Sequence, residues 1–407
     1  MAAPGGPPPQ ERIDATLAWV TERFRDAYAA APPEPPARFG RREFGFLWNG
    51  KKFFLRHLGF SSREAFQEFM AREAPHHAYY STAYYKTPHA PTMKEKEWLG
   101  ADLIFDLDAD HLPDAAKLSF AEQLARVKVE ARKLLHEFLL GDFGFEAEHV
   151  RIVFSGGRGY HFHVTDPRVH AMDAAARREV VDYLSPNDTV ATSLYEGWAF
   201  EKAKKRDKYG NVQRAKEVPP ASAPGWNGRI TKAVAAYLTD VASMEPRAAS
   251  RKLQELDGVG PKTAETIVAH LTPERIARIR DLGLLEQFDA LAREPVVKAL
   301  VREAKVLSEG ETDEPVTADV KRLIRLPGSL HGKTGLRVTP LSVDEFDRFD
   351  PLRDAVAFSD APARVVVSKP TEVPLLGKPF TAQPGEQELP LYAAMFVVLR
   401  RAALLPA

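Results

Sequence analysis

Residues 103–110, LIFDLDAD, place aspartates at every second position behind an apolar run. Side chains alternate between the two faces of a β-strand, so Phe105 is predicted to point into a core while Asp106, Asp108 and Asp110 share the opposite face. Like charges on one face repel, and a divalent cation with oxygen ligands would offset that repulsion. A strand end whose carboxylates face water is the alternative. The apolar run favours a buried strand that opens into a cleft and binds Mg²⁺ or Mn²⁺.

The composition is that of a folded protein without a strong overall charge. Its 407 residues suffice for one large domain or for two to three ordinary ones. Basic and acidic residues balance at 56 each, so a nucleic-acid partner would need local basic surface. The chain has no cysteine, which excludes disulfides and thiolate zinc sites. It has no apolar run of membrane-spanning length and no signal peptide, so we expect a soluble cytoplasmic protein without a membrane partner.

Helical and strand patterns alternate around the aspartate strand. The segment 11–30 has apolar residues at helical spacing, and a hairpin is predicted around Asn49-Gly50. Residues 115–140 have the pattern of one long amphipathic helix, and 149–166 that of a strand, a glycine turn and a second strand. This mixture predicts an α/β or α+β core of mixed β-sheets flanked by helices.

The pattern becomes mostly helical beyond the core segment and returns to strands later. A basic, proline-containing loop is predicted inside the helical part at 200–228, strand-like sequence resumes at 322–341, and an apolar helix follows near the C-terminus. The predicted parts are a flexible tail at 1–10, a first part of the core at 11–170, a mostly helical insertion at 171–305, and a second part of the core with the C-terminal helix at 306–407.

A second motif, FSGGRGYHFHV, occupies residues 154–164. Its glycines let the backbone approach an anion closely, with Ser155 and Arg158 as donors, and arginine can hold phosphate through two hydrogen bonds. His161 and His163 share one face of the following strand. The alternative is a tight hairpin with two ordinary histidines. The stretch is not a P-loop, because the GxxxxGK[ST] pattern is absent.

A third motif runs from Thr312 to Val338, TDEPVTADVKRLIRLPGSLHGKTGLRV. An aspartate precedes Pro315, and several cations follow on or around a strand, Arg325 and His331 among them. A surface charge run is the alternative. Leu323, Ile324 and Leu326 make the strand partly buried, so some of the cations are predicted to face an internal cleft, where they would complement a polyphosphate.

Together the three motifs resemble those of the catalytic small subunit of archaeal and eukaryotic DNA primases, with the archaeal forms the more similar. The resemblance rests on three patterns: hhhDhD, where h is a hydrophobic residue; SGxRGxH; and an acidic residue followed by RLIRLPGSLHGKTG. It covers most of residues 40–345. It implies a primase-polymerase core with an inserted, mostly helical subdomain. The implied activity is template-directed synthesis of short RNA primers by two-metal nucleotidyl transfer for the initiation of replication, with DNA primers left open.

The resemblance also implies roles for individual residues. Asp106 and Asp108 match its metal-binding pair, and the third carboxylate of the family stands eighteen residues before His331, which selects Asp313 over the competing Asp319. The positions that match nucleotide-binding residues are Arg56, Ser155, Arg158, His161, Arg325 and His331.

The implied partners are a primase large subunit that carries an iron–sulfur cluster, a single-stranded DNA template and nucleoside triphosphates. The implied location is the cytoplasm, at replication sites on the nucleoid. Many relatives have a zinc knuckle near the first motif, but DADHLPDAAKLSFAEQLA contains no thiol, so zinc is not predicted. No residue is identified that distinguishes ribonucleotides from deoxyribonucleotides.

Two segments are candidates for template contact. The first is the basic run 202–216, and the second is LDGVGPKTAETIV at 256–268, which resembles a helix-hairpin-helix whose GVG turn can present N–H groups to a DNA phosphate. A solvated loop and a simple helix connection are the alternatives. Two other functions stay open: a primer-extending repair polymerase of the same fold, and a non-catalytic DNA-binding subunit.

Overall fold

The aspartates lie on β6 (Leu103–Asp108), which belongs to a four-stranded antiparallel sheet with the order β12-β7-β8-β6. The other strands of this sheet are β7 (Val150–Phe154), β8 (Gly159–Val164) and β12 (Thr339–Leu341). Phe105 pairs with Phe162 of β8, and both side chains are buried. On the same face Tyr160 packs edge-on against Phe346, with ring centroids 5.4 Å apart. The prediction that Phe105 points into a core is therefore confirmed.

A second four-stranded sheet has the order β11-β3-β1-β2. Its strands are β1 (Phe44–Leu47), β2 (Leu55–Leu58), β3 (His77–Ser81) and β11 (Leu323–Arg325). Helix α1 (Gln10–Ala30) forms as predicted and buries every fourth residue, which are Thr16, Val20, Phe24 and Tyr28. Helix α2 (Arg63–Glu73) begins where the Ser62 hydroxyl accepts a hydrogen bond from the Ala65 N–H. The Phe66 ring of α2 packs 5.3 Å from that of Phe44.

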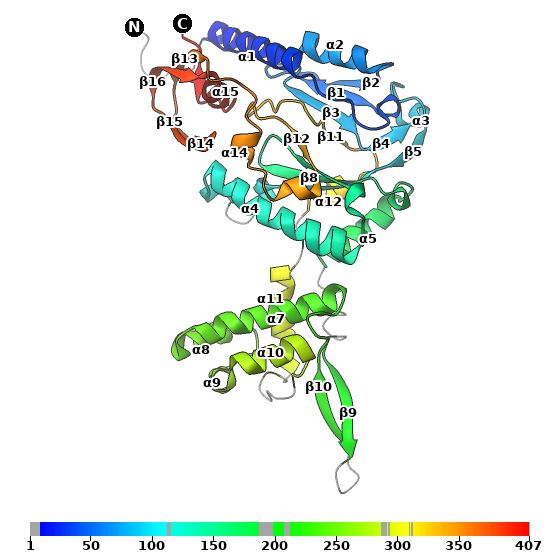
Figure 1. The fold of residues 1–407 in the computed structure, drawn as a ribbon, viewed down its shortest axis with the longest axis vertical. Coiled ribbons are helices and arrows are strands. Elements are labelled where there is room, and N and C mark those ends of the chain that lie inside the picture. Colours follow the sequence, from blue (N-terminus) through cyan, green and yellow to red (C-terminus); the bar gives the residue numbers. More distant parts are fainter. Residues whose placement is uncertain are drawn as a thin grey trace. The chain divides into compact units, whose positions relative to one another are not determined.

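The two sheets face each other across a narrow interior. The Tyr80 hydroxyl of β3 lies 3.2 Å from His163 Nδ1 of β8, and the two rings are stacked. Figure 1 shows the resulting layers, with α1 and α2 above the first sheet and α4 (Phe120–Lys133) below the second. Because Asp106 pairs with His161, which shares its strand face with His163, the aspartates point into the space between the sheets.

The structure describes residues 9–111, 115–186, 198–206, 212–285, 291, 294–308, 310 and 312–406. They belong to two units: unit 1 comprises Met1–Val180 and Thr312–Ala407, and unit 2 comprises Val181–Glu311. Unit 2 begins ten residues after the predicted start of the insertion, residue 171, and ends six residues after its predicted end, residue 305. The predicted flexible tail lies, apart from its last two residues, outside the described residues. Helices and antiparallel sheets together confirm the mixed α/β class.

Two predicted elements of unit 1 have different bounds in the structure. Strands β1 and β2 do pair antiparallel, but residues 48–54 connect them, so the hairpin loop is longer than a two-residue turn. The helix predicted at 115–140 starts at Phe120, where Ser119 and Glu122 form a capping box, and continues as a π-helical segment, Leu134–Asp142. A short 3₁₀ turn, Ala115–Lys117, precedes it.

Smaller elements complete the two halves of the core. They are α3 (Met93–Lys96), β4 (Ala83–Tyr85), β5 (Trp98–Ala101), α5 (Ala174–Leu184), α12 (Glu314–Ala318), α13 (Val343–Phe346) and α14 (Pro351–Asp354), with 3₁₀ turns at Phe39–Arg41, Ala109–His111, Ala147–His149 and Pro167–Val169. Strands β4 and β5 pair with each other.

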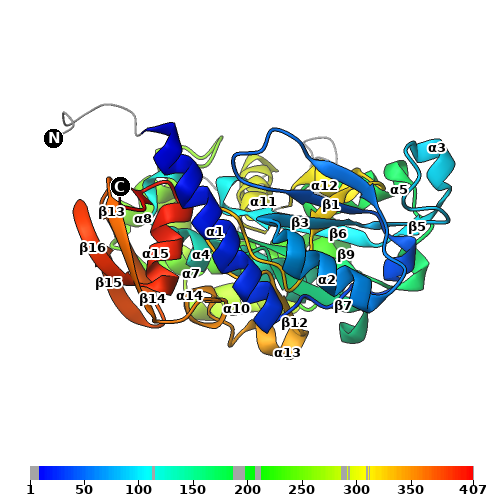
Figure 2. The same ribbon diagram turned by 90° about the horizontal axis from the view of Figure 1, so that it is seen from above.

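Strands that the sequence analysis missed lie between residues 362 and 404. They are β13 (Pro362–Val367), β14 (Thr371–Leu375), β15 (Lys378–Ala382), β16 (Gly385–Pro390) and β17 (Ala403–Leu404). The predicted C-terminal helix is α15 (Leu391–Leu399), which is buried from Ala393 onward. Figure 2 shows α15 beside α1. The Arg12 Nε–H donates to the carbonyl of Leu405, the residue after β17, at 2.6 Å, so the first helix is joined to the C-terminal segment.

Unit 2 is mostly helical, as predicted for the insertion. Its helices are α7 (Gly225–Ser243), α8 (Pro246–Gln254), α9 (Pro261–His270), α10 (Pro273–Leu282) and α11 (Glu294–Ser308). The loop predicted at 200–228 is wrong over its first half, because β9 (Phe200–Arg206) and β10 (Val212–Glu217) form an antiparallel hairpin there. This stretch lacks the alternation of apolar and polar residues by which a strand is recognised in a sequence.

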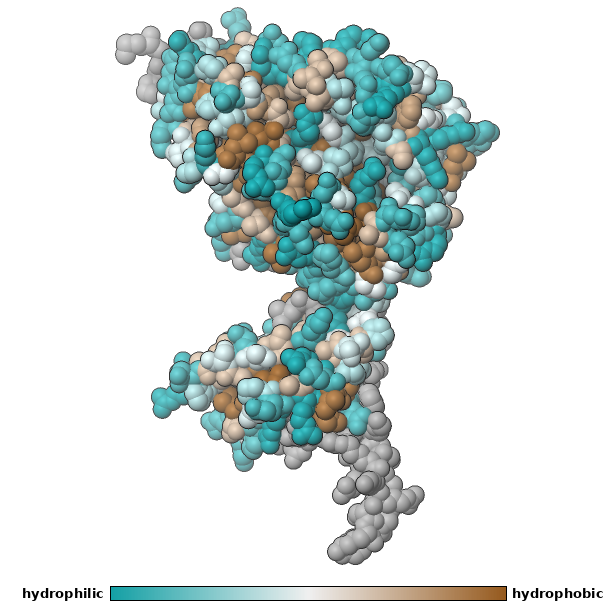
Figure 3. All heavy atoms as spheres, in the orientation of Figure 1, coloured by the Kyte–Doolittle hydropathy of each residue, from teal (hydrophilic) through white to brown (hydrophobic). Residues whose placement is uncertain are grey.

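The described helices include none that is both long enough and apolar enough to cross a membrane. The face drawn in Figure 3 is mostly hydrophilic, with hydrophobic residues showing at separate places.

Asp102 is predicted to be a large single contributor to the stability of unit 1. Its carboxylate pairs with Arg42 at 2.6 Å, and both side chains are 2% exposed. Asp102→Asn leaves the buried guanidinium without a counter-charge, so we expect a loss of about 3–5 kcal/mol in the free energy of unfolding. The matched change Asp347→Asn breaks only an exposed pair with Arg132 and should cost less than about 1 kcal/mol. Equal losses in urea denaturation would contradict this assignment.

His76 is predicted to make folding sensitive to acid. The ring bridges Thr21 of α1 and the Asn49 N–H, and burial lowers its pKa to about 4. The unfolded chain binds this proton near pH 6.5, so the contribution is complete above that pH and is lost as the pH falls toward 4. His76→Gln should make the fall in unfolding free energy shallower by about 1.4 kcal/mol per pH unit. A pH slope in His76→Gln equal to that of the wild type would contradict this assignment.

Candidate active site

Asp106 and Asp108 occupy one face of β6, as the alternation of the strand predicts. Both are half-buried, whereas their neighbours Phe105 and Leu107 are buried on the opposite face. Asp106 lies opposite His161 and Asp108 opposite Gly159 in the register with β8. The two carboxylates are thereby fixed one strand away from the glycine turn.

Asp110 does not continue this row, so that part of the prediction is wrong. The strand ends at Asp108, and Asp110 sits in the 3₁₀ turn Ala109–His111. Its N–H donates to Asp108 Oδ1 at 3.0 Å, and its carboxylate pairs with Arg158. The third aspartate therefore belongs to a turn and not to the strand, and its carboxylate pairs with Arg158 beside the cavity that Asp108 also lines.

The main chain of Asp313 lies directly beside β6. Its N–H donates to the Asp106 carbonyl at 2.8 Å, and α12, which starts with the next residue, packs on the strand. Asp319 is at the other end of α12, where its Oδ1 accepts from the Lys321 N–H. Of the two candidates for the third carboxylate, the structure thus brings Asp313 to the aspartate pair.

The side chains do not by themselves form a metal cage. Within the described ranges, no group of three or more histidine, aspartate or glutamate side chains is gathered closely enough to hold an ion. The oxygen donors of Asp106 and Asp108 share one strand face, and the Asp313 main chain is hydrogen-bonded to it. These hard oxygen ligands fit Mg²⁺ or Mn²⁺, and the metal site stays a prediction.

His161, on the neighbouring strand β8, contacts the Asp106 carboxylate. The His161 Nε2 lies 3.3 Å from Asp106 Oδ1, and the imidazole is 4% exposed. Burial, together with the charge of Arg325, lowers the pKa of His161 to about 3. The ring is therefore neutral at ordinary pH, and Nε2 is the ring nitrogen that faces the carboxylate. Its position orients Asp106, whereas the resemblance implies contact with the triphosphate.

The glycine turn between β7 and β8 is tied together by Ser155. The Ser155 hydroxyl accepts from the N–H groups of Gly157 and Gly159, each at 3.2 Å. Gly156 has a φ of +73°, and a side chain there would lie 2.7 Å from the Cβ of His331. Glycine at this position therefore allows the loop with His331 to close on the turn.

His331 and Arg325 bring the third motif to the same place. The Nδ1 of His331 accepts from the Lys333 N–H at 3.3 Å, so in the neutral ring Nε2 carries the proton, beside Gly157. Burial and the nearby Arg325 charge keep the pKa of His331 well below 6.5. The Arg325 guanidinium contacts His77 at 2.7 Å and lies over the Tyr79 ring.

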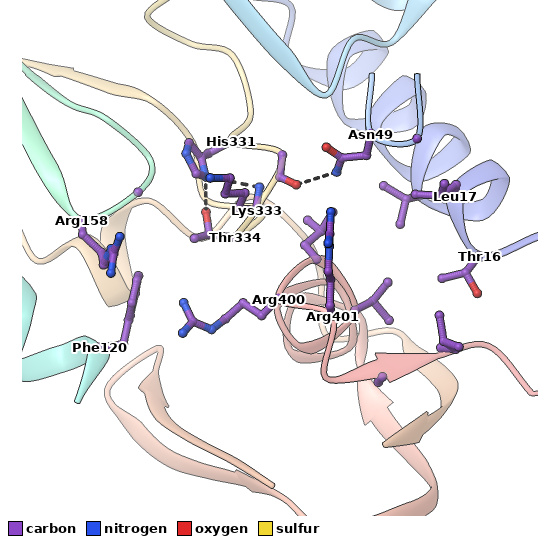
Figure 4. A pocket seen from close by; sticks show the side chains of 18 of the residues that line it. Thr16, Leu17, Asn49, Phe120, Arg158, His331, Lys333, Thr334, Arg400 and Arg401 are labelled. Carbon is purple, nitrogen blue, oxygen red and sulfur yellow. Dashed lines mark hydrogen bonds between the residues drawn. The ribbon is translucent and has the colours of Figure 1, made fainter. Parts of the chain in front are cut away.

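These residues open into a cavity of about 1050 Å³. It is lined at one end by Asp108 and Asp110, and around it by Arg158, Arg325 and His331. Figure 4 shows Arg158 and His331 on one side, with α1 residues Thr16 and Leu17 on the other. Ser155 and His161 are buried behind this wall. The space is larger than a typical small-ligand pocket, which favours a nucleotide together with part of a second chain.

Arg56, a further predicted site residue, lies on β2 and is engaged by an acidic partner there. Its Nε donates to the Glu43 carboxylate at 3.1 Å, and Glu43 also pairs with Lys96 at 2.5 Å. Glu43 is fully buried; burial opposes its ionisation, but Lys96 and Arg56 outweigh that effect and lower its pKa. Arg56 is not among the described residues that line the cavity, and its contact with a nucleotide stays a prediction.

The sequence analysis missed the cationic residues that the C-terminal segment adds to the cavity, Arg400 and Arg401. The stretch VVLRRAAL was interpreted only as the end of an apolar helix. Two adjacent arginines at the end of an otherwise buried helix are a signal that could have indicated them, since such a pair is rarely placed there by packing.

Comparisons with known proteins agree with this geometry. A model of the family described as DNA primase small subunit matches residues 105–343, from the aspartate strand to just beyond β12. The DNA primase small subunit PriS of Methanothrix thermoacetophila is 41% identical over 392 residues, which cover 95% of this chain and 98% of the relative. The proteins of the same name from Methanococcoides burtonii and Methanocella arvoryzae are 40% and 39% identical, over 95% and 96% of this chain and 98% of each relative.

The family match contains all three motifs, and the structure brings Asp108, the glycine turn and the loop of His331 to one cavity, with Asp106 on the same strand face as Asp108. The chain belongs to the DNA primase small-subunit family, whose members are the catalytic subunits of a primase.

Proposed function

We propose that the cavity between the sheets carries out template-directed nucleotidyl transfer, joining nucleoside triphosphates into short primers on single-stranded DNA. The observation that carries this proposal is the hydrogen bond from the Asp313 N–H to the Asp106 carbonyl. It joins the two distant acidic motifs, and the glycine turn is already paired to the same strand. RNA primers are the expected product, and DNA primers are left open.

Asp106, Asp108 and Asp313 are the residues that would hold Mg²⁺ or Mn²⁺. Such ions, when bound, lower the pKa of an attacking hydroxyl and neutralise the charge that develops on the phosphates. Zinc is not proposed, because the chain has no thiol to bind it.

The protein groups around the carboxylates would position the substrate. The neutral His161 keeps the Asp106 carboxylate in one orientation, and Ser155 keeps the glycine turn closed. Arg158, Arg325 and the Nε2–H of His331 supply charge and donors for phosphate oxygens. A bound triphosphate would compete with Asp110 for Arg158. Fixing the phosphates in this way orients the α-phosphorus for in-line attack by a 3′-hydroxyl.

The partners follow from the same proposal. The relatives are named small subunits, so this chain is expected to act with a large subunit, and the heterodimer is proposed to work on single-stranded DNA at replication sites in the cytoplasm. An iron–sulfur cluster would belong to that partner, because this chain has no cysteine to bind one.

Formation of a dinucleotide from two free nucleotides separates a primase from its closest alternative. A primer-extending repair polymerase would add nucleotides only to an existing 3′ end. A DNA-binding subunit without catalysis would incorporate none. The informative assay uses labelled ribonucleotides or deoxyribonucleotides on an unprimed single-stranded template, with and without the co-expressed large subunit.

Substitution of the carboxylates tests the site directly. Asp106→Asn, Asp108→Asn and Asp313→Asn are each expected to lower the rate of primer synthesis by at least about 1000-fold, because each removes a ligand of the ions that activate the hydroxyl. Asp319→Asn, at the far end of α12, should retain the rate within about threefold, since its amide oxygen can still accept from Lys321. Loss of activity in Asp319→Asn with a fully active Asp313→Asn would reverse the assignment.

The turn between α8 and α9 is the proposed contact with template phosphates. Gly258 has a φ of +79°, and Gly260 precedes the first turn of α9, where Lys262 is exposed. Lys262→Gln should lower the slope of log affinity against log salt for single-stranded DNA by about one. The exposed Lys232→Gln on α7 is the matched control. An unchanged slope in Lys262→Gln would mean that the turn only connects two packed helices. The basic run 202–216 falls partly outside the described residues and is not part of this test.

A further inference from the structure

Helix α15 ends by presenting two adjacent arginines to the cavity. Its residues from Ala393 to Leu399 are buried, which fixes the helix in place. The Arg401 N–H donates to the Val398 carbonyl at 2.9 Å, and Arg401 has a φ of +59°. The chain turns sharply there into β17, so both arginines stand on a rigid support. Figure 4 shows Arg400 pointing toward Arg158 and Phe120, with Arg401 leaving the same helix end on the side of Lys333.

Arg400 is held in a way that leaves its donors available. The guanidinium carbon lies 4.9 Å from the ring centre of Phe120 and 5.4 Å from that of Phe396. Stacking on aromatic faces uses the plane of the guanidinium and not its N–H edges. The group is therefore oriented while its hydrogen-bond donors can still bind an anion.

The cations around this part of the cavity lack compensating charge. Within the described part of the chain, the side chains of Lys333, Arg400 and Arg401 make no hydrogen bond or ion pair. Five basic side chains and two carboxylates line the cavity, and Asp110 already pairs with Arg158. Burial lowers the pKa of Arg400, and the repulsion from the nearby Arg158 charge adds a smaller effect in the same direction. An anionic ligand would offset that repulsion.

We propose that Lys333, Arg400 and Arg401 form a diphosphate subsite, which receives the terminal phosphates of the bound nucleoside triphosphate and holds the pyrophosphate that leaves. This inference rests on the proposed function. Lys333 belongs to the third motif, whereas Arg400 and Arg401 lie beyond residues 105–343, which the family model matches, so two of the three members of the subsite are outside the motifs. The other source of a phosphate group, the backbone of the template, is an outcome of the test.

The chemistry of transfer gives such a subsite a role in the rate. The 3′-oxygen forms a bond to the α-phosphorus, its proton passes to solvent, and the bond from the α-phosphorus to the bridging oxygen breaks. That oxygen keeps the electron pair, so the leaving pyrophosphate gains negative charge in the transition state. Cations at that end stabilise the transition state more strongly than they stabilise the bound triphosphate before reaction. Their loss should therefore lower kcat as well as affinity.

The test is calorimetric titration of the full chain with inorganic pyrophosphate in the presence of Mg²⁺. The double variant Arg400→Gln, Arg401→Gln should raise the Kd of pyrophosphate at least about 10-fold and leave the Kd of a nucleoside monophosphate within about twofold. The matched control is Arg364→Gln on β13, an exposed arginine whose carboxylate partner, Glu388, lies 3.6 Å away, and it should change neither. Should the double variant fail to fold, Arg401→Gln alone, which disturbs no aromatic stack, should raise the pyrophosphate Kd about threefold.

Several outcomes would overturn the subsite. Pyrophosphate affinity equal to that of the wild type is one, and equal weakening of pyrophosphate and monophosphate is another. A variant that loses affinity only for a labelled single-stranded oligonucleotide would assign the arginines to the template backbone instead. A wild-type chain that binds pyrophosphate in this way but incorporates no nucleotide would contradict the proposed function and leave the subsite standing.

Discussion

The antiparallel pairing of β6 with β8 is the constraint on which the site depends. Its register sets Asp106 against His161 and Asp108 against Gly159, so the acidic pair and the glycine turn cannot shift independently. A slip of one residue would move both carboxylates to the face where Phe105 and Phe162 are buried. The large apolar side chains on that face therefore fix the position of the charges on the other.

Neutral histidines recur around this pairing. His161 supports Asp106, His163 joins the two sheets through Tyr80, and His331 approaches the glycine turn. Burial lowers the pKa of each, so these three imidazoles are neutral and add no positive charge around the carboxylates. The positive charge of the cavity is left to arginine and lysine.

The sequence predicted those parts of the site that depend on local periodicity. Alternation along a strand suffices to put Asp106 and Asp108 on one face, and it fails at Asp110 because a 3₁₀ turn begins one residue after Asp108. The ion pair between Glu43 and Arg56 could not be predicted, since Glu43, Arg56 and Lys96 meet only in the folded chain. The strands after residue 362 were missed because they are short and interrupted by proline and glycine. The place of Arg400 depends on how α15 packs, which no local pattern reports.

The ends of unit 2 have a consequence for the architecture of related enzymes. The Gly310 N–H donates to the Leu184 carbonyl at 2.9 Å, so the polypeptide departs and returns through one pair of neighbouring backbone groups. The segment between Leu184 and Gly310 can be lengthened, shortened or exchanged without altering the distance from β6 to Asp313. The length of unit 2 thus places no constraint on the hydrogen bond from the Asp313 N–H to the Asp106 carbonyl.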